Sequence, residues 1–296
     1  MYTRLLTPLT ASDGENLALY SWLPEDSTKQ IDSQGITTKR GVVLIVHGLG
    51  EHAGRYDHVA HHLQDWGFEV RAYDQRGHGE SGGKPGVLPR NTTLLDDLTE
   101  VLDDTRQHYV HFADLPLILL GHSLGGLVAS RFVSLRIRPV EGLVLSSPAL
   151  DAGLGGFQKL LLKVLPRLVP DLCVGNGLDV NYLSHNPQVV KAYLSDRLVH
   201  NKISPRLGQF IATAGPLTVA AADSWRSPTL LMYAGADRLV NAAGSDEFAK
   251  RANQSKTVKP GTVTAKRFDG YYHELFNETD AARVFELLKS WLDARF

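Results

Sequence analysis

The regular alternation of short, continuously apolar runs with longer amphipathic segments is the strongest constraint on the fold of this 296-residue chain. Unbroken apolarity is typical of parallel strands that are covered on both faces. The segments between the runs carry helical stripes, for example over Leu94–Tyr109 and Ala281–Ala294. Strand–helix alternation of this kind predicts an α/β fold with a mostly parallel, doubly wound sheet. The strands are expected at Gly41–Val46, Phe68–Tyr73, Leu115–Leu120, Gly142–Ser146, Thr229–Tyr233 and Val263–Phe268.

Two parts of the chain depart from this alternation. The N-terminal part predicts two strands, Thr3–Leu9 and Asn16–Trp22, and then a polar surface loop over Ser27–Lys39. A later segment has helix patterns around Pro187–Leu194 and Pro205–Thr213 but no clear strand, and so long an insertion between two strands is usually a functional lid. The expected organisation is a core in two parts with an inserted helical cap: 1–149 and 228–296 for the core, 150–227 for the cap.

Composition narrows the class of protein. The chain has 31 basic and 32 acidic side chains, a net charge of −1 and 43% hydrophobic residues. These values argue against a disordered chain and against a nucleic-acid binder that works through bulk charge. Cys173 is the single cysteine, so a disulfide framework and a thiolate metal cluster are both excluded. Because residues 1–12 lack the apolar core of a secretory signal and no apolar run approaches ~18 residues, we expect a cytoplasmic protein without a metal or cofactor.

The segment Gly121-His-Ser-Leu-Gly125 follows a predicted strand and precedes a predicted helix over Gly126–Leu135. This is the G-x-S-x-G nucleophile elbow in the strand–turn–helix context that it requires. The two glycines leave room for a sharp turn that holds the Ser123 hydroxyl exposed above the sheet. The pattern therefore predicts Ser123 as a catalytic nucleophile.

A serine hydroxyl is a poor nucleophile and needs a base that is itself oriented by a carboxylate. In this fold the acid and then the histidine follow the serine along the chain. His273 follows the last predicted strand, whereas His185 and His200 lie in the insertion, where no strand end would fix them. Asp237 directly follows a strand at the same sheet edge, while Asp269 is more typical of a turn. We predict His273 as base and Asp237 as its orienting acid, with Asp269 as the alternative acid.

Acyl transfer also requires two backbone N–H groups that point at the developing oxyanion. One is expected from Leu124, the residue after the nucleophile, and the other from the loop His47-Gly-Leu-Gly50. Leu49 is the candidate in that loop because glycines on both sides let the backbone turn its N–H inward. The alternative is a glycine-rich turn with no catalytic role.

Longer motifs surround these positions: His47-Gly-Leu-Gly-Glu-His-Ala-Gly-Arg-Tyr56, Asp74-Gln-Arg-Gly-His-Gly-Glu-Ser-Gly-Gly83, Gly121-His-Ser-Leu-Gly-Gly126, Ser146-Ser-Pro148, Gly235-Ala-Asp-Arg-Leu239 and Tyr272-His273. In order and spacing they resemble the monoacylglycerol lipase and lysophospholipase branch of the α/β-hydrolases, along nearly the whole chain and least in the insertion. The resemblance implies an α/β-hydrolase fold with a helical cap, no cofactor, and hydrolysis of single-chain acylglycerols or lysolipids. It assigns the same nucleophile, acid, base and oxyanion donors as the spacing does.

One position departs from that family. Its mammalian lipases carry a further histidine three residues past the catalytic one, where this chain has Phe276, so the polar pocket for the alcohol is expected to differ. Glu51, Arg55 and Tyr56 follow the oxyanion loop and are expected to line the alcohol side, but they equally fit a role in capping the next helix. Gly48 and His122 are also expected to bind the substrate.

The insertion contains a leucine-rich helix pattern over Phe157–Val169, in which basic residues recur every four positions at Lys159, Lys163 and Arg167. Such a helix suits peripheral contact with a lipid interface. The alternative is a cap helix that packs its leucines on the core, which the short length of the segment and its interruption at Pro166 favour. Both interpretations build an apolar entrance over the nucleophile. The predicted substrate contacts in it are Leu161 and Leu165.

The sequence thus predicts a serine esterase that cleaves esters of single-chain lipids through an acyl-enzyme intermediate. The alternatives are a lysophospholipase, a carboxylesterase for short- to medium-chain esters, a related aminopeptidase, or a non-catalytic ligand-binding scaffold. The insertion has no acidic cluster to hold a substrate α-amino group, which disfavours the peptidase. Ser123 disfavours a dehalogenase, which carries an aspartate at the elbow. The expected partner is a small lipid ester, not a nucleic acid, and the oligomeric state stays open.

Overall fold

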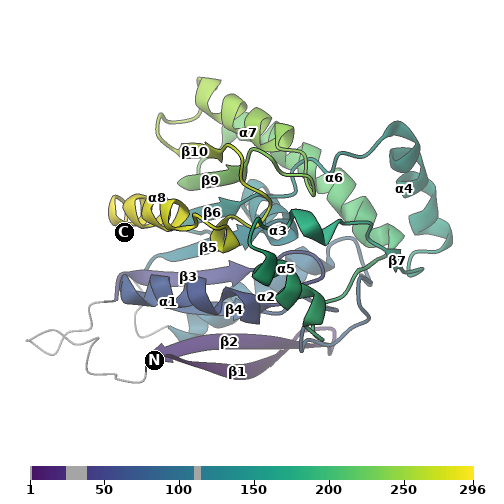
Figure 1. The fold of residues 1–296 in the computed structure, drawn as a ribbon, viewed down its shortest axis with the longest axis horizontal. Coiled ribbons are helices and arrows are strands. Elements are labelled where there is room, and N and C mark those ends of the chain that lie inside the picture. The colour runs from purple at the N-terminus through teal and green to yellow at the C-terminus, as the bar shows by residue number, and fades with distance from the viewer. Residues whose placement is uncertain (1, 25–38, 110–114) are drawn as a thin grey trace, which may run out of the picture.

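A computed structural model describes residues 2–24, 39–109 and 115–296 (Figure 1). Its centre is an eight-stranded sheet in the order β1-β2-β4-β3-β5-β6-β9-β10. The strands from β4 to β10 are parallel to their neighbours, whereas β2 is antiparallel to both β1 and β4. The predicted α/β fold with a mostly parallel sheet is confirmed. The strands are β1 (Tyr2–Thr10), β2 (Asn16–Pro24), β3 (Gly41–Val46), β4 (Phe68–Tyr73), β5 (Leu117–His122), β6 (Gly142–Ser146), β9 (Thr229–Ala234) and β10 (Val263–Phe268).

Helices cover both faces of this sheet (Figure 1). Side chains of α1 and α8 join one buried apolar cluster, and those of α2, α3, α6 and α7 join the other. Successive residues of β3 alternate between the two, with Val43 in the first and Leu44 in the second. Burial on both faces therefore explains the unbroken apolar runs of the sequence. These helices are α1 (Asp57–Asp65), α2 (Thr93–His108), α3 (Leu124–Ser134), α6 (Pro205–Ala221), α7 (Ala243–Gln254) and α8 (Ala282–Asp293).

The predicted strands agree with the structure to within about two residues at each end. The largest shift is in β5, expected over Leu115–Leu120, which begins only after Pro116 and extends to His122, where it still pairs with Ser146 of β6. Proline has no N–H to donate to a ladder, which accounts for the later start. The loop expected over Ser27–Lys39 lies outside the described residues except for Lys39.

Residues 150–227 lie between β6 and β9 and differ from expectation in three respects. They do contain strands, because the two-residue strands β7 and β8 pair antiparallel. Helix α4 is not interrupted at Pro166 but continues through it to Leu168, and α6 extends beyond the expected Thr213 to Ala221. Pro166 has no N–H to donate to the Leu162 carbonyl, and that carbonyl accepts instead from Gln209 Nε2 of α6 at 3.2 Å. The remaining elements are α4 (Gly156–Leu168), β7 (Val174–Gly175), α5 (Pro187–Ser195) and β8 (Lys202–Ile203), with the short 3₁₀ helices η2 (Ala53–Tyr56), η4 (Val180–Tyr182), η5 (Ala222–Ser224) and η6 (Leu275–Asn277).

The two halves of this insertion are packed differently. Helix α6 lies on α3 and α7, and its residues Leu207 and Phe210 belong to the larger apolar core. Helix α4 instead packs on α6 and stands out from the body of the molecule (Figure 1). No helix of the described residues is both long and apolar enough to pass through a bilayer.

Candidate active site

Ser123 occupies a strained turn between β5 and α3. Its backbone has φ 52° and ψ −117°, a conformation that side-chain-bearing residues rarely adopt. The turn is held by the Ser123 N–H, which donates to the Ser146 carbonyl at 3.0 Å, and by the Ser123 carbonyl, which accepts from Leu127 N–H at 3.0 Å. Hydrogen bonds on both sides of the residue thus maintain the strain and aim the hydroxyl at the pocket.

The flanking glycines are required by steric contact. A Cβ atom at Gly121 would lie 2.6 Å from the Gly125 carbonyl oxygen, and one at Gly125 would lie 2.0 Å from the Val46 carbonyl oxygen. Both distances are far below a van der Waals contact, and the atoms in the way are backbone. The G-x-S-x-G spacing therefore follows from the close packing of the elbow against itself and against β3.

The predicted acid and base lie together, although they are far apart in sequence. His273 Nδ1 and Asp237 Oδ2 are 2.6 Å apart, and both side chains are buried. The other carboxylate oxygen of Asp237 accepts the N–H groups of Leu239 at 2.8 Å and Val240 at 3.1 Å. The alternative acid, Asp269, has an 86% exposed side chain and pairs with an arginine instead. The histidine thus has a fixed carboxylate partner, and that partner is Asp237.

The electrostatics of the pair suit a base. Burial by itself would lower the pKa of His273, but the charge and hydrogen bond of Asp237 outweigh burial and raise this pKa above its ordinary value. Conversely, burial raises the pKa of Asp237, while the charge of His273 and the hydrogen bonds to the carboxylate lower it overall. Close by, His122 has its pKa lowered to about 4 by burial and by His273, whose ring centroid is 4.8 Å away. His122 is therefore neutral near pH 7.

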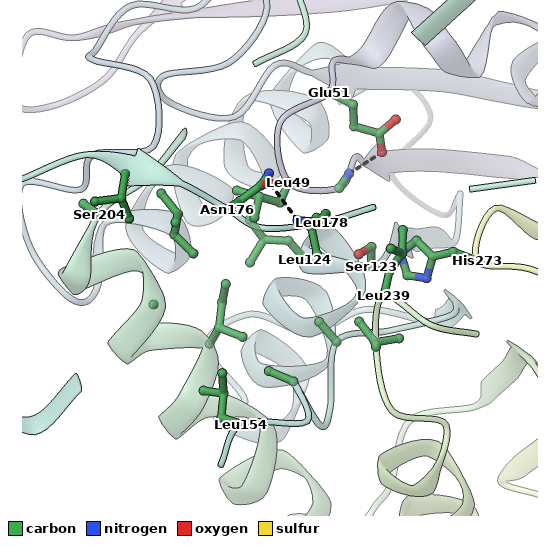
Figure 2. A pocket seen from close by; sticks show the side chains of 18 of the residues that line it. Leu49, Glu51, Ser123, Leu124, Leu154, Asn176, Leu178, Ser204, Leu239 and His273 are labelled. Carbon is green, nitrogen blue, oxygen red and sulfur yellow. Dashed lines mark hydrogen bonds between the residues drawn. The ribbon is translucent and has the colours of Figure 1, made fainter. Parts of the chain in front are cut away.

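The expected oxyanion loop lies directly against the nucleophile. A Cβ atom at Gly48 would come within 3.2 Å of Ser123 Cβ. Leu49 from this loop and Leu124 from the start of α3 line the same pocket as Ser123 and His273 (Figure 2). The residues of the two expected donors thus both lie at the serine, one in the loop after β3 and the other in the first turn of α3.

A buried ionic network stands beside the oxyanion loop. Arg55 donates to Glu51 Oε2 at 2.5 Å and to both oxygens of Glu274, at 2.6 and 2.8 Å. Glu51 Oε1 accepts from the Gly48 N–H at 2.6 Å and from the Tyr56 hydroxyl at 2.7 Å. Burial opposes the ionisation of Glu51, but the charge of Arg55 prevails and brings its pKa to about 2.

This network corrects one sequence expectation. Gly48, Glu51 and His122 line the pocket as expected, but Arg55 and Tyr56 are not among its lining residues. They stand behind Glu51 and hold it by hydrogen bonds, because the pocket side of the loop is occupied by Glu51 itself. Nor do their side chains cap α1, whose start has no side-chain cap hydrogen bond.

Sequence reasoning missed Glu274 and Tyr193. Both line the pocket, and both contact Arg55: Glu274 through its carboxylate, and Tyr193 through its ring, 4.8 Å from the guanidinium carbon. The position of Glu274 directly after His273, in the loop that follows β10, is a signal that could have identified it. Tyr193 lies in α5 of the insertion, where the sequence gives no comparable signal.

The pocket has a cavity volume of about 370 Å³ and extends from the catalytic residues under the insertion. In Figure 2, Ser123 and His273 lie at one end and Ser204, at the start of α6, at the other. Leu161 and Leu165 line it as predicted. Most of the wall between is aliphatic and comes from Leu124, Leu154, Leu162, Leu172, Val174, Leu178, Ile203, Ile211, Leu239 and Val240.

Helix α4 does not pack its leucines on the core, which was one of the two interpretations of its sequence. Leu160 is 57% and Leu168 71% exposed, and Val164 is also exposed. Helix α4 packs on α6, and among the described residues these outer side chains remain exposed.

Among the described residues, no group of three or more histidine, cysteine or acidic side chains is arranged to hold a metal ion. The described part of the pocket brings together a buried histidine–aspartate pair, a strained serine and the residues of the two expected backbone donors. This set fits acyl transfer through a serine nucleophile.

Comparisons with known proteins agree with this geometry. The family model described as serine aminopeptidase, S33, matches residues 37–280. The monoacylglycerol lipase of Mycolicibacterium smegmatis is 36% identical over 86% of this chain and 89% of its own length. The Bacillus subtilis phospholipase YtpA is 30% identical over 85% of this chain and 95% of its own length.

A solved structure, the monoacylglycerol lipase of Paleococcus ferrophilus, superposes with a TM-score of 0.77 at 34% identity, covering 88% of this chain and 96% of that one. The fold, the elbow and these relatives lead to one conclusion. The chain belongs to the serine aminopeptidase, S33, family of α/β-hydrolases, and within it to the group of the monoacylglycerol lipases.

Proposed function

We propose that the protein is a serine esterase that hydrolyses carboxylic esters of single-chain lipids through an acyl-enzyme intermediate. The observation that carries this proposal is the long aliphatic pocket that begins at Ser123. An acyl chain in such a pocket buries apolar surface, which contributes ~0.8 kcal/mol per methylene. The relatives named as monoacylglycerol lipase and phospholipase support lipid esters as the substrate class.

In the proposed mechanism Ser123 attacks the ester carbonyl while His273 takes its proton. Asp237 keeps the imidazole oriented and stabilises the cation that forms. The N–H groups of Leu49 and Leu124 hold the oxyanion of the tetrahedral intermediate. His273 then protonates the leaving alcohol, and afterwards it activates the water that releases the fatty acid.

The pocket disfavours the aminopeptidase alternative. A peptidase of this type needs a free carboxylate to hold the substrate α-ammonium group. Glu51 and Glu274 are acidic residues of the pocket wall close to the elbow, and both are already paired with Arg55. All four oxygens of these carboxylates already accept hydrogen bonds from protein groups, so neither carboxylate is free for an ammonium group, and an uncharged glycerol or another neutral alcohol fits this end better.

Relative kcat/KM values for 1-monoacylglycerols, lysophosphatidylcholine, p-nitrophenyl esters and an aminoacyl p-nitroanilide test the proposal. We expect lipid esters to be preferred over the anilide by at least 100-fold. The Ser123→Ala variant controls for background hydrolysis, and fluorophosphonate labelling of the wild type but not of this variant identifies the nucleophile. Preference for the anilide, or absence of labelling and turnover, would refute the esterase.

We further propose that residues 150–227 act as the cap and that the outer face of α4 contacts anionic lipid surfaces. The exposed apolar residues Leu160, Val164 and Leu168 lie on the same helix as exposed Lys163 and Arg167. The apolar side chains suit insertion among acyl chains, and each basic residue adds about 1 kcal/mol near an anionic surface. Leu172 and Val174 continue the exposed apolar surface to the pocket, which gives a lipid substrate a route inward.

Sedimentation with phosphatidylserine-containing vesicles at low and high salt tests this contact. The double variant Lys163→Gln/Arg167→Gln should bind roughly 30-fold more weakly at low salt, since two contributions of about 1 kcal/mol are lost. The matched control is Lys256→Gln/Lys259→Gln, in the loop after α7 and away from α4 (Figure 1). Equal binding of both variants, or no binding by the wild type, would contradict the proposed contact and leave the esterase proposal intact.

A further inference from the structure

His47 is completely buried behind the oxyanion loop, and both of its ring nitrogens are engaged. Nε2 accepts the backbone N–H of Gln75 at 2.8 Å. Nδ1 lies 2.7 Å from the carbonyl oxygen of Gly48. Because Nε2 is an acceptor, it carries no proton, and the proton of the neutral ring must be on Nδ1. The Gly48 carbonyl therefore accepts a hydrogen bond from His47.

This hydrogen bond fixes the direction of the following N–H. The peptide bond between Gly48 and Leu49 is trans, and in a trans peptide the C=O and N–H groups point in opposite directions. With the Gly48 carbonyl turned inward to the His47 ring, the Leu49 N–H must point outward. The outward side of the loop is the side that packs against Ser123.

The neighbouring groups of the loop are held as well. The His47 carbonyl accepts from Gln75 Nε2 at 2.6 Å, and the Gly48 N–H donates to Glu51 at 2.6 Å. The Gly50 carbonyl accepts from the His200 N–H at 2.9 Å. The loop is thus anchored on both sides of the Leu49 N–H, and His47 is the residue that orients the peptide carrying it.

We infer that His47 is a positioning residue that aims the Leu49 N–H at the oxyanion by holding the Gly48 carbonyl. This inference rests on the proposed function, since it assigns a purpose to the proposed oxyanion donor. It requires a neutral imidazole protonated on Nδ1. Burial has the largest effect on the pKa of His47 and lowers it. A lowered pKa favours the neutral ring.

Two amide substitutions separate the contacts of the ring. Asparagine places an amide nitrogen near the position of Nδ1, so His47→Asn can still donate to the Gly48 carbonyl. Glutamine reaches the position of Nε2, so His47→Gln can still accept from Gln75 but loses the donor to Gly48. Both variants replace a buried imidazole by a polar amide, so each controls for the loss of packing in the other.

The readout is the ratio of kcat/KM for an ester to that for the matching thionoester. Sulfur is a weak hydrogen-bond acceptor, so this ratio reports on the oxyanion donors and not on general integrity. Loss of a whole donor costs ~10²–10³-fold in kcat. For His47→Gln we expect a fall in ester kcat of at least 10-fold with little change in KM, a smaller ester/thionoester ratio, and substantial recovery of both in His47→Asn. Equal losses in the two variants, or an unchanged ratio, would overturn the inference.

A measurement on the wild type keeps the inference testable should the variants not fold. Nitrogen-15 NMR of the histidine rings should show His47 as the neutral Nδ1–H tautomer, and a protonated Nε2 would overturn the assignment. If the wild type neither turns over esters nor labels at Ser123, the proposed function fails while the tautomer of His47 is still measured. The two failures are therefore distinguishable.

Discussion

The far end of the pocket offers a sharp test of acyl-chain binding through Gly208→Ala. Gly208 lies in α6 one turn after Ser204, and a Cβ atom there would be 2.9 Å from Leu162 Cδ2. Both Gly208 and Leu162 line the pocket. The atom in the way is the end of a flexible side chain, so we expect Leu162 to move into the pocket while the backbone stays in place. Alanine is also the better helix former by about 1 kcal/mol, so the variant should fold.

The expected effect depends on chain length. Each methylene that no longer fits forfeits ~0.8 kcal/mol, which is a factor of about 4 in kcat/KM. If the displaced leucine occupies the space of about two methylenes, long-chain esters lose roughly 15-fold, whereas esters too short to reach Leu162 lose nothing. The chain length at which kcat/KM stops rising should then fall by about two carbons.

The assay is kcat/KM for p-nitrophenyl esters from butyrate to palmitate. Gly156→Ala is the matched control, because it is the same substitution at the start of α4, where the new Cβ meets no atom within 4 Å beyond its chain neighbours and the backbone of its own helix. We expect the control to follow the wild-type profile. A uniform loss at all lengths, or an unchanged plateau, would refute the assignment of this end of the pocket to the acyl chain.

Further predictions concern the catalytic residues and the elbow. Asp237→Asn should lower kcat by roughly 10⁴-fold, whereas Asp269→Asn should stay near wild type, and the reverse ranking would show the acid assignment to be wrong. His273 must be neutral to act as a base, and its pKa is raised. In a pH–rate profile kcat/KM should therefore rise with pH through a midpoint above ~6.5. A midpoint well below that value would contradict the pairing of His273 with Asp237. Gly125→Ala should lower the free energy of unfolding by at least ~3 kcal/mol in urea titrations, because its Cβ would meet the Val46 carbonyl oxygen at 2.0 Å. An equally stable variant would mean that the turn at Ser123 can move away from β3, contrary to the packing argument. Activity should survive EDTA, and its loss with recovery on adding a divalent ion would overturn the serine mechanism.

The sequence by itself determined the elements whose signal is local. A strand that is buried on both faces, such as β3, needs an apolar side chain at each consecutive position. The sequence pattern alone therefore identifies such a strand, whichever elements cover it. The elbow is equally local, since the clashes that require Gly121 and Gly125 arise within the turn and at the adjacent strand end. The placement of Asp237 and His273 after strands followed from a general property of parallel sheets, whose carboxyl ends share one edge.

The tertiary structure alone decided contacts between distant segments. Arg55 and Glu274 are 219 residues apart, and neither position signals the other, so the ionic network beside the oxyanion loop could not be read from the chain. The alternating leucines and basic residues of α4 fit both a covered helix and an exposed one. Only the position of α4 on α6 shows that, among the described residues, Leu160 and Leu168 remain exposed. The physical reason is that periodicity encodes which face of an element is apolar, whereas the long-range packing of the chain determines what that face meets.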